Sequence, residues 1–569
     1  MTRLRNPVIR GFAPDPSLIR VGDWYYVATS SFEWFPTIPI HRSRDLAHWE
    51  YAGHVRGAAP GGSLAGVPDS GGIWAPSLSW DGERFWVTYA IVRSVGTPYF
   101  DTDTYVSTAT DVDGVWSAPR RVPSHGFDPA LFHEGGRVWL LNLQNDHRPD
   151  GRRFAGIVLT ELDRGTLSPA GGTHLLLQHD RLIEGPKVVR RAGWYYLLLA
   201  EGGTGFEHGV RVARARELTG PYELDDRPLL TSRDDPSLPL QKAGHGELVR
   251  TPGGDWVLSH LTARPVGTPD GPRCPLGRET AIQAVTWDAE GWPRLRHGGW
   301  HPEVEVEVEV EAPGTVDVRD SVDLRHTVDV RDTVDASEPV DVPGASEAPT
   351  DSLAALSQLP DYTDLLGWPW SSPRTAPDPS WADAVTRPGW IRLRGRHGPE
   401  SRWAHSLLAQ RLTEHRAEAE VTVEARPRTF TQAAGLMLWY SAEAYLALDL
   451  TWAEPEGEGQ RGQQWRGQGR TVLSLVARQE SGTRQVALVD VAPEGPLTLG
   501  ATVDGAEARF WYVRNGVRTP VGPSLDFTEL SDDYGSKLRF TGSMAGIHAV
   551  DLVDAAFSAD FTGFRLTCR

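Results

Sequence analysis

Cysteine is nearly absent from this chain, which has only Cys274 and Cys568 among its 569 residues. Two distant cysteines cannot form the disulfide framework of a small secreted domain. No segment approaches the roughly 18 consecutive apolar residues of a membrane-spanning helix. Residues 1–7 also lack the apolar run of a signal peptide. We therefore expect a cytoplasmic protein with no membrane partner.

Basic residues are outnumbered by acidic ones, with 57 Lys and Arg against 75 Asp and Glu. The formal net charge is −18 at pH 7, and the isoelectric point is near 5.5. Because nucleic acid phosphates require a basic surface, this balance argues against a nucleic acid partner. The chain is too long for one ordinary hydrophobic core, so we expect two or more domains.

A short aromatic or apolar run follows a glycine five times in the first 300 residues. These glycines are Gly22, Gly82, Gly136, Gly193 and Gly254, at spacings of 60, 54, 57 and 61 residues. A repeat of this size is typical of stacked or radially arranged units. About 55–60 residues suit one four-stranded blade, so the repeat predicts a five-bladed β-propeller over residues 1–302.

Each unit also carries a polar triplet shortly before its glycine. The triplets begin at Asp15, Ala75, Asp128, Glu184 and His245. A turn explains either aspartate alone, and a solvated loop explains Glu184 alone. Equivalent placement in a propeller would instead bring all three carboxylates to one channel, where they cannot all ionise normally. Glycoside hydrolysis requires such a division between a protonated acid and an ionised partner.

The second half of the chain differs in character. Residues 303–355 are acidic and of low complexity, beginning with a Glu-Val repeat to Val310. This composition favours a solvated linker, although the alternating valines could form an edge strand or β-arm. Residues 356–569 regain strand patterns without the 57-residue period, as in residues 417–424. They predict an antiparallel β-sandwich, which makes the whole chain all-β.

Several of these segments resemble glycoside hydrolase family 43. In the first half they are Asn6–Ser17, Gly71–Pro76, Gly126–Pro129, Ile183–Pro186 and Gly277–Gln283. In the second half, Ala434–Leu436 and Phe540–Gly542 are similar to the sandwich of the β-xylosidase branch, a concanavalin A-like jelly roll.

The resemblance implies an inverting mechanism. It makes Asp15 the general base and Glu184 the general acid, while Asp128 orients the acid and tunes its pKa. It also implies that Arg278 binds sugar hydroxyls and assists Asp15 electrostatically.

The resemblance also implies a substrate pocket. Phe32, Trp74 and Phe127 would line the glycone site, and Phe540 would reach it from the sandwich unless it is an ordinary core residue. His245 matches a histidine beneath the channel that contacts calcium or water in some relatives. A buried, hydrogen-bonded propeller histidine explains it equally well.

We therefore predict a β-xylosidase that removes xylose from the non-reducing ends of xylo-oligosaccharides. An α-L-arabinofuranosidase, alone or as a second activity, is the nearest alternative. A non-catalytic carbohydrate-binding propeller is more remote, because all three carboxylates are present, and a phosphorolytic enzyme would require a stronger anion site. We expect no required cofactor, with calcium near His245 as an option. The resemblance favours a homodimer or homotetramer.

Overall fold

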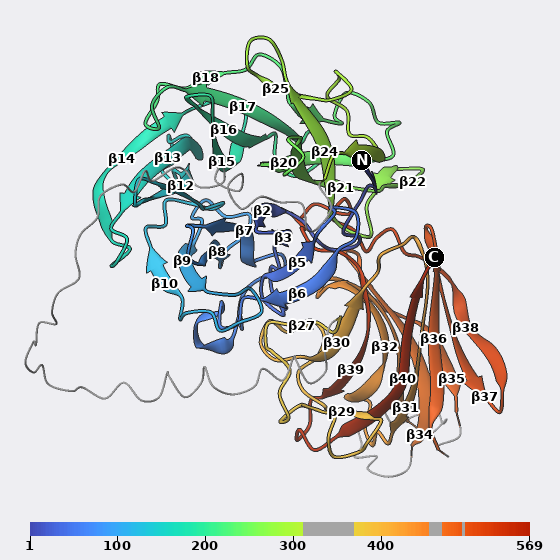
Figure 1. The fold of residues 1–569 in the computed structure, drawn as a ribbon. Coiled ribbons are helices and arrows are strands. Elements are labelled where there is room, and N and C mark those ends of the chain that lie inside the picture. The colour runs from blue at the N-terminus through green and yellow to red at the C-terminus, as the bar shows by residue number, and fades with distance from the viewer. Residues whose placement is uncertain (311–368, 455–468, 492–494) are drawn as a thin grey trace, which may run out of the picture.

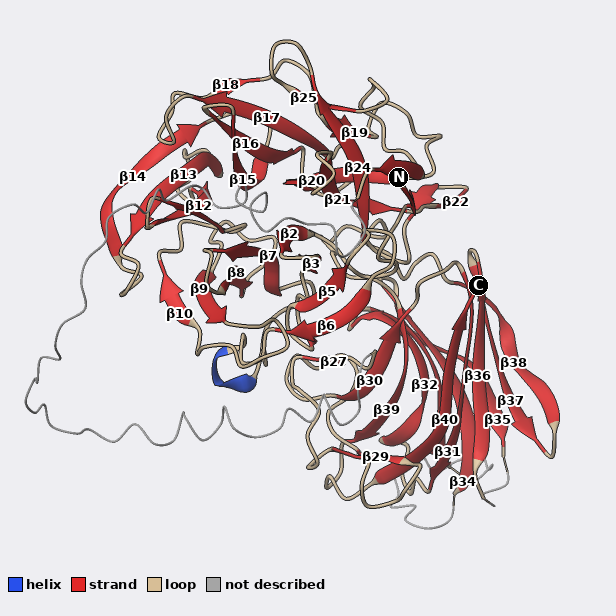
Figure 2. Cartoon of the chain, viewed as in Figure 1, coloured by secondary structure: helices blue, strands red, loops and turns tan. Residues whose placement is uncertain are grey.

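Nearly all of the regular structure is β-strand. The computed structural model describes residues 1–310, 369–454, 469–491 and 495–569. These residues form two β domains that lie side by side, with one short 3-10 turn, η1 (Pro60–Gly62) (Figures 1 and 2). Within those ranges, no helix has the length and apolarity needed to cross a bilayer.

The N-terminal domain is built around five antiparallel sheets of four or five strands, each formed by strands that are consecutive or nearly so in sequence. The first sheet contains β2 (Ser17–Val21), β3 (Trp24–Ala28), β5 (Pro39–Ser43) and β6 (Glu50–His54), and the second contains β7 (Gly72–Trp80), β8 (Phe85–Val92), β9 (Thr102–Ala109) and β10 (Arg120–Val122). The third contains β11 (Ala130–Glu134), β12 (Arg137–Asn145), β13 (Phe154–Leu162) and β14 (Pro169–Leu177). The fourth contains β15 (Ile183–Arg191), β16 (Trp194–Glu201), β17 (Gly209–Ala215), β18 (Glu223–Leu224) and β19 (Leu230–Thr231), and the fifth contains β20 (Gln241–Arg250), β21 (Trp256–Ala263), β24 (Glu279–Trp287) and β25 (Pro293–Leu295).

The first strands of the five sheets surround a common axis. Strand β2 contacts β7, β7 contacts β11, β11 contacts β15, β15 contacts β20, and β20 contacts β2. The repeated glycines occupy the turns that follow these strands, and all five have positive φ angles, from 60° at Gly22 to 102° at Gly82. Glycine adopts this conformation without steric cost, which explains why the sequence repeat follows the blades. The predicted five-bladed propeller is confirmed.

A residue in the left-handed conformation recurs at the channel end of each blade. Its φ angle is 54° at Asp15, 36° at Ala75, 52° at Asp128, 57° at Gly185 and 51° at His245. A non-glycine residue held this way costs on the order of 1–3 kcal/mol, and such strain is concentrated at functional sites. In the fourth blade the repeated position is Gly185, and Glu184 precedes it by one residue. The predicted triplet that begins at Glu184 is therefore out of register by one residue.

The start of the Glu-Val repeat is a strand. Strand β26 (Glu305–Val308) pairs antiparallel with β1 (Thr2–Arg5), and its two valines are buried against Leu4 and Ile9. The first part of the predicted linker therefore belongs to the propeller, as the edge-strand alternative proposed. Residues 311–355 of that linker, and 356–368 of the predicted sandwich, lie outside the described residues.

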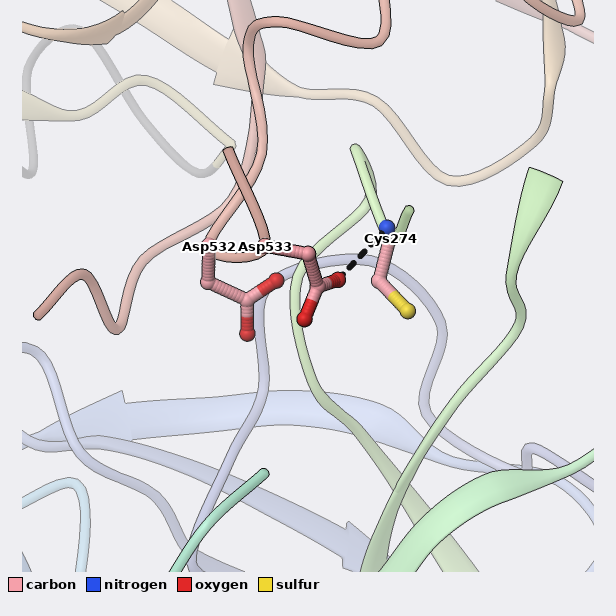
Figure 3. A group of neighbouring side chains, drawn as sticks. All are labelled: Cys274, Asp532 and Asp533. Carbon is pink, nitrogen blue, oxygen red and sulfur yellow. Dashed lines mark hydrogen bonds between the residues drawn. The ribbon is translucent and has the colours of Figure 1, made fainter. Parts of the chain in front are cut away.

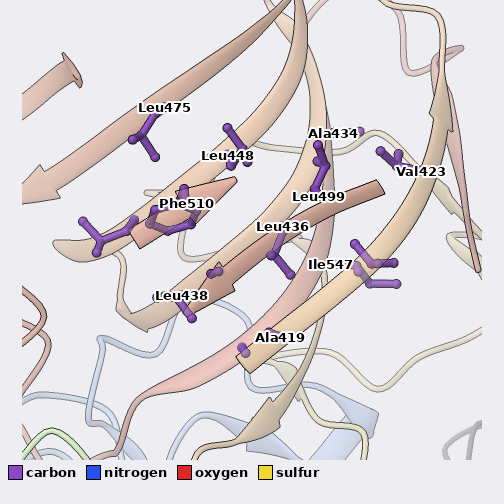
Figure 4. Packing of buried hydrophobic residues seen from close by; sticks show 14 of the residues in the cluster. Ala419, Val423, Ala434, Leu436, Leu438, Leu448, Leu475, Leu499, Phe510 and Ile547 are labelled. Atoms are coloured by element: carbon purple, nitrogen blue, oxygen red, sulfur yellow. The ribbon is translucent and has the colours of Figure 1, made fainter. Parts of the chain in front are cut away.

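The C-terminal domain is a sandwich of two antiparallel sheets. One contains β28 (Ala382–Asp383), β29 (Ile391–Arg394), β40 (Ser558–Cys568), β31 (Arg416–Ala425), β36 (Leu497–Asp504), β37 (Glu507–Arg514) and β38 (Val517–Asp526). The other contains β30 (Ser406–Arg411), β39 (Met544–Asp551), β32 (Gln432–Ser441), β33 (Ala444–Ala453), β34 (Arg470–Gln479) and β35 (Gly482–Asp490). Alternating residues from both sheets, such as Leu436 and Leu499, fill the space between them (Figure 4).

Two segments join the domains near the channel. Strand β27 (Ser372–Pro373) pairs with β4 (Trp34–Phe35), so one strand of each domain shares a small sheet. The loop between β38 and β39 lies against the loop before β24. A Cβ atom on Gly277 would come within 2.3 Å of the Thr541 carbonyl oxygen, and one on Gly542 within 2.5 Å of the Leu276 carbonyl oxygen. Only glycine permits this close backbone approach, which brings Phe540 to the propeller.

Candidate active site

A cavity of about 420 Å³ lies where the channel meets the sandwich loop. This volume falls within the range of about 300–1,000 Å³ that is typical of small-molecule sites. All nine predicted site residues line it, namely Asp15, Phe32, Trp74, Phe127, Asp128, Glu184, His245, Arg278 and Phe540.

Asp15 is held as an ionised carboxylate. It is 7% exposed, its Oδ2 accepts a 2.6 Å hydrogen bond from Ser30, and its Oδ1 lies 3.3 Å from Arg278 Nη1. Burial alone would raise the pKa of Asp15. The charge of Arg278 and the hydrogen bond from Ser30 outweigh burial and lower this pKa below its ordinary value. An ionised carboxylate in a cavity can accept a proton from water.

Asp128 and Glu184 form a coupled acidic pair. Burial and the charge of Asp15 raise the pKa of Asp128 to about 8. Burial and the charges of Asp128 and Asp15 raise the pKa of Glu184 well above its ordinary value. Asp128 accepts a 3.0 Å hydrogen bond from the Gly185 N–H, whereas no donor in the described part of the chain reaches the Glu184 carboxyl. We therefore place the proton on Glu184 first, because its ionised form has less stabilisation.

Arg278 connects the carboxylates to the sandwich. Its side chain is buried, and its Nη1 donates to Thr204 Oγ1 at 2.6 Å as well as contacting Asp15. Its Nη2 donates to the Phe540 carbonyl oxygen at 2.7 Å. Arg278 thus fixes the charge of Asp15 and the position of the sandwich loop together.

Aromatic rings form one wall of the cavity. The ring centroids of Trp74 lie 5.9 Å from Phe32, 5.6 Å from Phe127 and 5.2 Å from Phe540. Phe540 comes from the sandwich loop, is only partly buried and lines the cavity, so it is not an ordinary core residue. Aromatic faces of this kind can pack against the C–H faces of a sugar ring.

Comparisons with known proteins agree with this geometry. Residues 4–293 match the family described as "Glycosyl hydrolases family 43", and residues 362–567 match the "Beta xylosidase C-terminal Concanavalin A-like domain". The chain belongs to glycosyl hydrolase family 43. The resemblance predicted from the motifs is therefore confirmed, and the chain is a glycoside hydrolase.

Several family 43 proteins are similar over nearly the whole chain. The xylosidase/arabinosidase 43B of Humicola insolens is 36% identical, with 99% of this chain and 97% of that protein covered. The β-xylosidase of Bacillus subtilis (strain 168) is 32% identical, with 99% of each covered. The crystal structure of xylan β-1,4-xylosidase from Bacillus halodurans C-125 is 36% identical, with a TM-score of 0.85 over 99% of this chain and 100% of that one.

Calcium near His245 stays a prediction, and in the part of the chain that the structure describes few oxygen ligands lie around this ring. Calcium prefers six to eight oxygen ligands, about 2.3–2.6 Å away. His245 is buried, and its Nδ1 lies 3.7 Å from Asp15 Oδ1, an oxygen that Arg278 also contacts. Its other side packs beneath Gly185, where an added Cβ would meet the imidazole at 2.9 Å. Burial lowers the pKa of His245 to about 4, so it is a neutral ring that supports the channel floor.

Another group of possible metal ligands contains Cys274, Asp532 and Asp533 (Figure 3). Lys242 already supplies a cation there, with its Nζ 2.6 Å from Asp533 and 3.0 Å from Asp532. Burial raises the pKa of the Cys274 thiol, which therefore stays protonated and is a poor metal ligand. Asp532 and Asp533 of the sandwich loop are thus attached to strand β20 by their ion pairs with Lys242.

Sequence reasoning missed several residues at this family 43 site. Ser30 bonds to Asp15, Thr204 bonds to Arg278, and Phe100 packs against Trp74 and Phe127. Lys187 is buried near Asp128, where its charge opposes the rise in the pKa of that carboxyl, and its Nζ lies 2.7 Å from Ser77 Oγ. These residues lie outside the repeated triplets or follow them. The glycine-rich segment 202–205 was the one local signal, since it marks a close backbone approach beside Thr204.

Proposed function

We propose that this family 43 enzyme is an inverting exo-β-xylosidase that acts on xylo-oligosaccharides. The observation that carries the proposal is the division of charge in the cavity. The pKa of Asp15 is lowered while that of Glu184 is raised, in one aromatic-walled cavity. Relatives that cover nearly the whole chain are named xylosidases, which supports xylose as the sugar.

Each carboxylate has a distinct role in this mechanism. Glu184 donates its proton to the glycosidic oxygen, so that the leaving sugar departs as a neutral alcohol. Asp15 accepts a proton from water, which attacks the anomeric carbon from the opposite face and inverts its configuration. Asp128 lies beside Glu184, and the coupling of these two buried carboxyls keeps the pKa of the acid raised. Arg278 keeps Asp15 ionised and presents a donor to sugar hydroxyls.

The partly covered cavity favours exo action. The sandwich loop covers one side of the channel, and the backbone of Phe540 is bonded to propeller residues on both sides. A cavity covered on one side in this way accepts the end of a chain more readily than its middle. We therefore expect single xyloses to be released from the non-reducing end.

Hydrolysis of aryl β-D-xyloside and aryl α-L-arabinofuranoside, measured side by side, tests the substrate. The xyloside should be cleaved with the higher kcat/KM. Proton NMR of the first product should show α-xylose, the anomer expected from inversion. Initial release of β-xylose would contradict the mechanism, and absence of cleavage of both substrates would contradict the function.

Arabinofuranosidase activity is the second candidate. The relative from Humicola insolens is named for both sugars. Arabinofuranose and xylopyranose present similar hydroxyl patterns to one pocket. A kcat/KM for the arabinofuranoside within about tenfold of the xyloside value would mark a bifunctional enzyme, since roughly 1.4 kcal/mol separates such rates.

A further inference from the structure

Ser70 lies in the loop between β6 and β7, behind the aromatic wall of the cavity. It is 1% exposed, and its φ angle of 61° places its backbone in the left-handed region. It is absent from the residues that line the cavity. A buried, strained serine that no substrate can touch calls for an explanation in terms of its neighbours.

Three polar groups of Ser70 bond to three different partners. Its N–H donates to Glu33 Oε2 at 3.1 Å, and Glu33 directly follows Phe32 in sequence. Its carbonyl oxygen accepts a 2.9 Å hydrogen bond from the indole N–H of Trp74. Its Oγ accepts a 2.9 Å hydrogen bond from the N–H of Phe540. One residue therefore connects aromatic positions from both domains.

The bond to Phe540 matters most, because it crosses between the domains. Arg278 holds the carbonyl oxygen of Phe540, and Ser70 holds its N–H. The ring of Phe540 then lies 5.2 Å from that of Trp74 and 6.0 Å from that of Phe32. Loss of the Ser70 hydroxyl would leave this backbone held from one side only, and the ring would sample other positions.

We propose that Ser70 is a positioning residue that sets the substrate-binding wall by fixing Phe540 against Trp74. The proposal rests on the proposed glycosidase function for its kinetic readout. It assigns to Ser70 an effect on sugar binding that passes through the Phe540 ring and not through the chemistry at Asp15 or Glu184.

Ser70→Ala is the direct test, since the native residue already places a Cβ in the left-handed backbone and the change removes only the oxygen. One lost hydrogen bond should raise KM for aryl β-xyloside about two- to tenfold, with a smaller change in kcat. Ser63→Ala is the matched control, because that hydroxyl in the same loop bonds to the Ala65 N–H and the Arg374 carbonyl oxygen, away from the cavity. KM for this control should stay within about twofold of the wild type. Ser70→Gly removes the same oxygen while relaxing the backbone, and should behave like Ser70→Ala.

A double-mutant cycle with Phe540→Ala separates positioning from general stability. If Ser70 acts through the ring, Ser70→Ala should change KM less than about twofold in the Phe540→Ala background. An undiminished effect there, or a kcat loss equal to the KM rise, would overturn the proposal. Calorimetric affinity for xylose, which the enzyme does not cleave, gives a second readout. A wild type that binds xylose but cleaves no xyloside would contradict the proposed function, while a weaker affinity of Ser70→Ala for xylose would still support positioning.

Discussion

The propeller and the sandwich are both built from antiparallel strands, yet different kinds of side chain lie at their centres. The sandwich places leucine, valine, alanine and phenylalanine between its sheets (Figure 4). The propeller axis instead holds carboxylates, Lys187 and Arg278, with left-handed residues at the channel end of each blade. Radial blades leave a central channel that side chains must line, whereas two facing sheets close on each other. The arrangement of sheets therefore explains why the carboxylates of the site gather at the propeller axis.

Removal of the base should give the largest effect. Asp15→Asn keeps the shape and tolerates the left-handed backbone, but cannot accept a proton. The kcat/KM should fall about 10²–10⁴-fold on both xylobiose and activated aryl xylosides, because both require water activation. Circular dichroism should show an unchanged fold. Activity within tenfold of the wild type would remove Asp15 from the mechanism.

Removal of the acid should give a loss that depends on the leaving group. Glu184→Gln should lower kcat/KM for xylobiose about 10²–10⁴-fold, since a sugar alkoxide leaves poorly without a proton. Dinitrophenyl xyloside should lose much less, because its phenolate departs unaided. A parallel loss on both substrates would contradict the assignment of Glu184 as the acid.

The sandwich core should respond in stability. Leu436 is fully buried between the sheets, and Leu436→Ala should lower the free energy of unfolding by about 2–5 kcal/mol. Denaturant unfolding measures this change, and kcat/KM at low temperature should stay near the wild-type value. Leu488→Ala, at a position 44% exposed, is the control and should change stability by less than about 0.5 kcal/mol. If Leu436→Ala lowered activity without loss of stability, the assignment of a purely structural role to the sandwich core would be wrong.

The pH dependence of the free energy of unfolding should reveal the raised pKa of Asp128 at the propeller axis. In the folded state the pKa of Asp128 is about 8, above the value near 4 in an unfolded chain. The folded state thus binds this proton more tightly, and the resulting stability is fully present below about pH 4 and lost as the pH rises through 8. Wild type should therefore lose stability over this window by at most about 1.4 kcal/mol per pH unit from this group, and Asp128→Asn should lose less. Parallel stability curves for the two proteins would show that Asp128 ionises normally.

Much of the fold and part of the site were predictable from the sequence. The glycine period follows from turns that each blade must make, so it revealed the number of blades. The triplets revealed Asp15, Asp128 and His245 at the repeated position. They placed Glu184 one residue out of register, because the amino-acid sequence alone does not show which residue adopts a positive φ angle. Ser70 and Thr204 could not be found this way. Their roles depend on loops from distant segments that meet only after both domains have folded.

The sandwich contributes Phe540 to the cavity of the propeller, so this residue tests whether both domains form the site. Phe540→Ala should lower kcat/KM about three- to tenfold, the effect of losing roughly 0.5–1.5 kcal/mol of aromatic contact. Its stability should change little, because the ring faces the cavity. The matched control is Phe527, which belongs to the same loop. It is 1% exposed and packs in the sandwich core. Phe527→Ala should cost about 3–5 kcal/mol of stability while the protein that remains folded keeps its kcat/KM. Two phenylalanines thirteen residues apart in one loop would then act separately, one on the reaction and the other on folding. If Phe540→Ala melted early and kept full activity when cold, the propeller alone would form the active site.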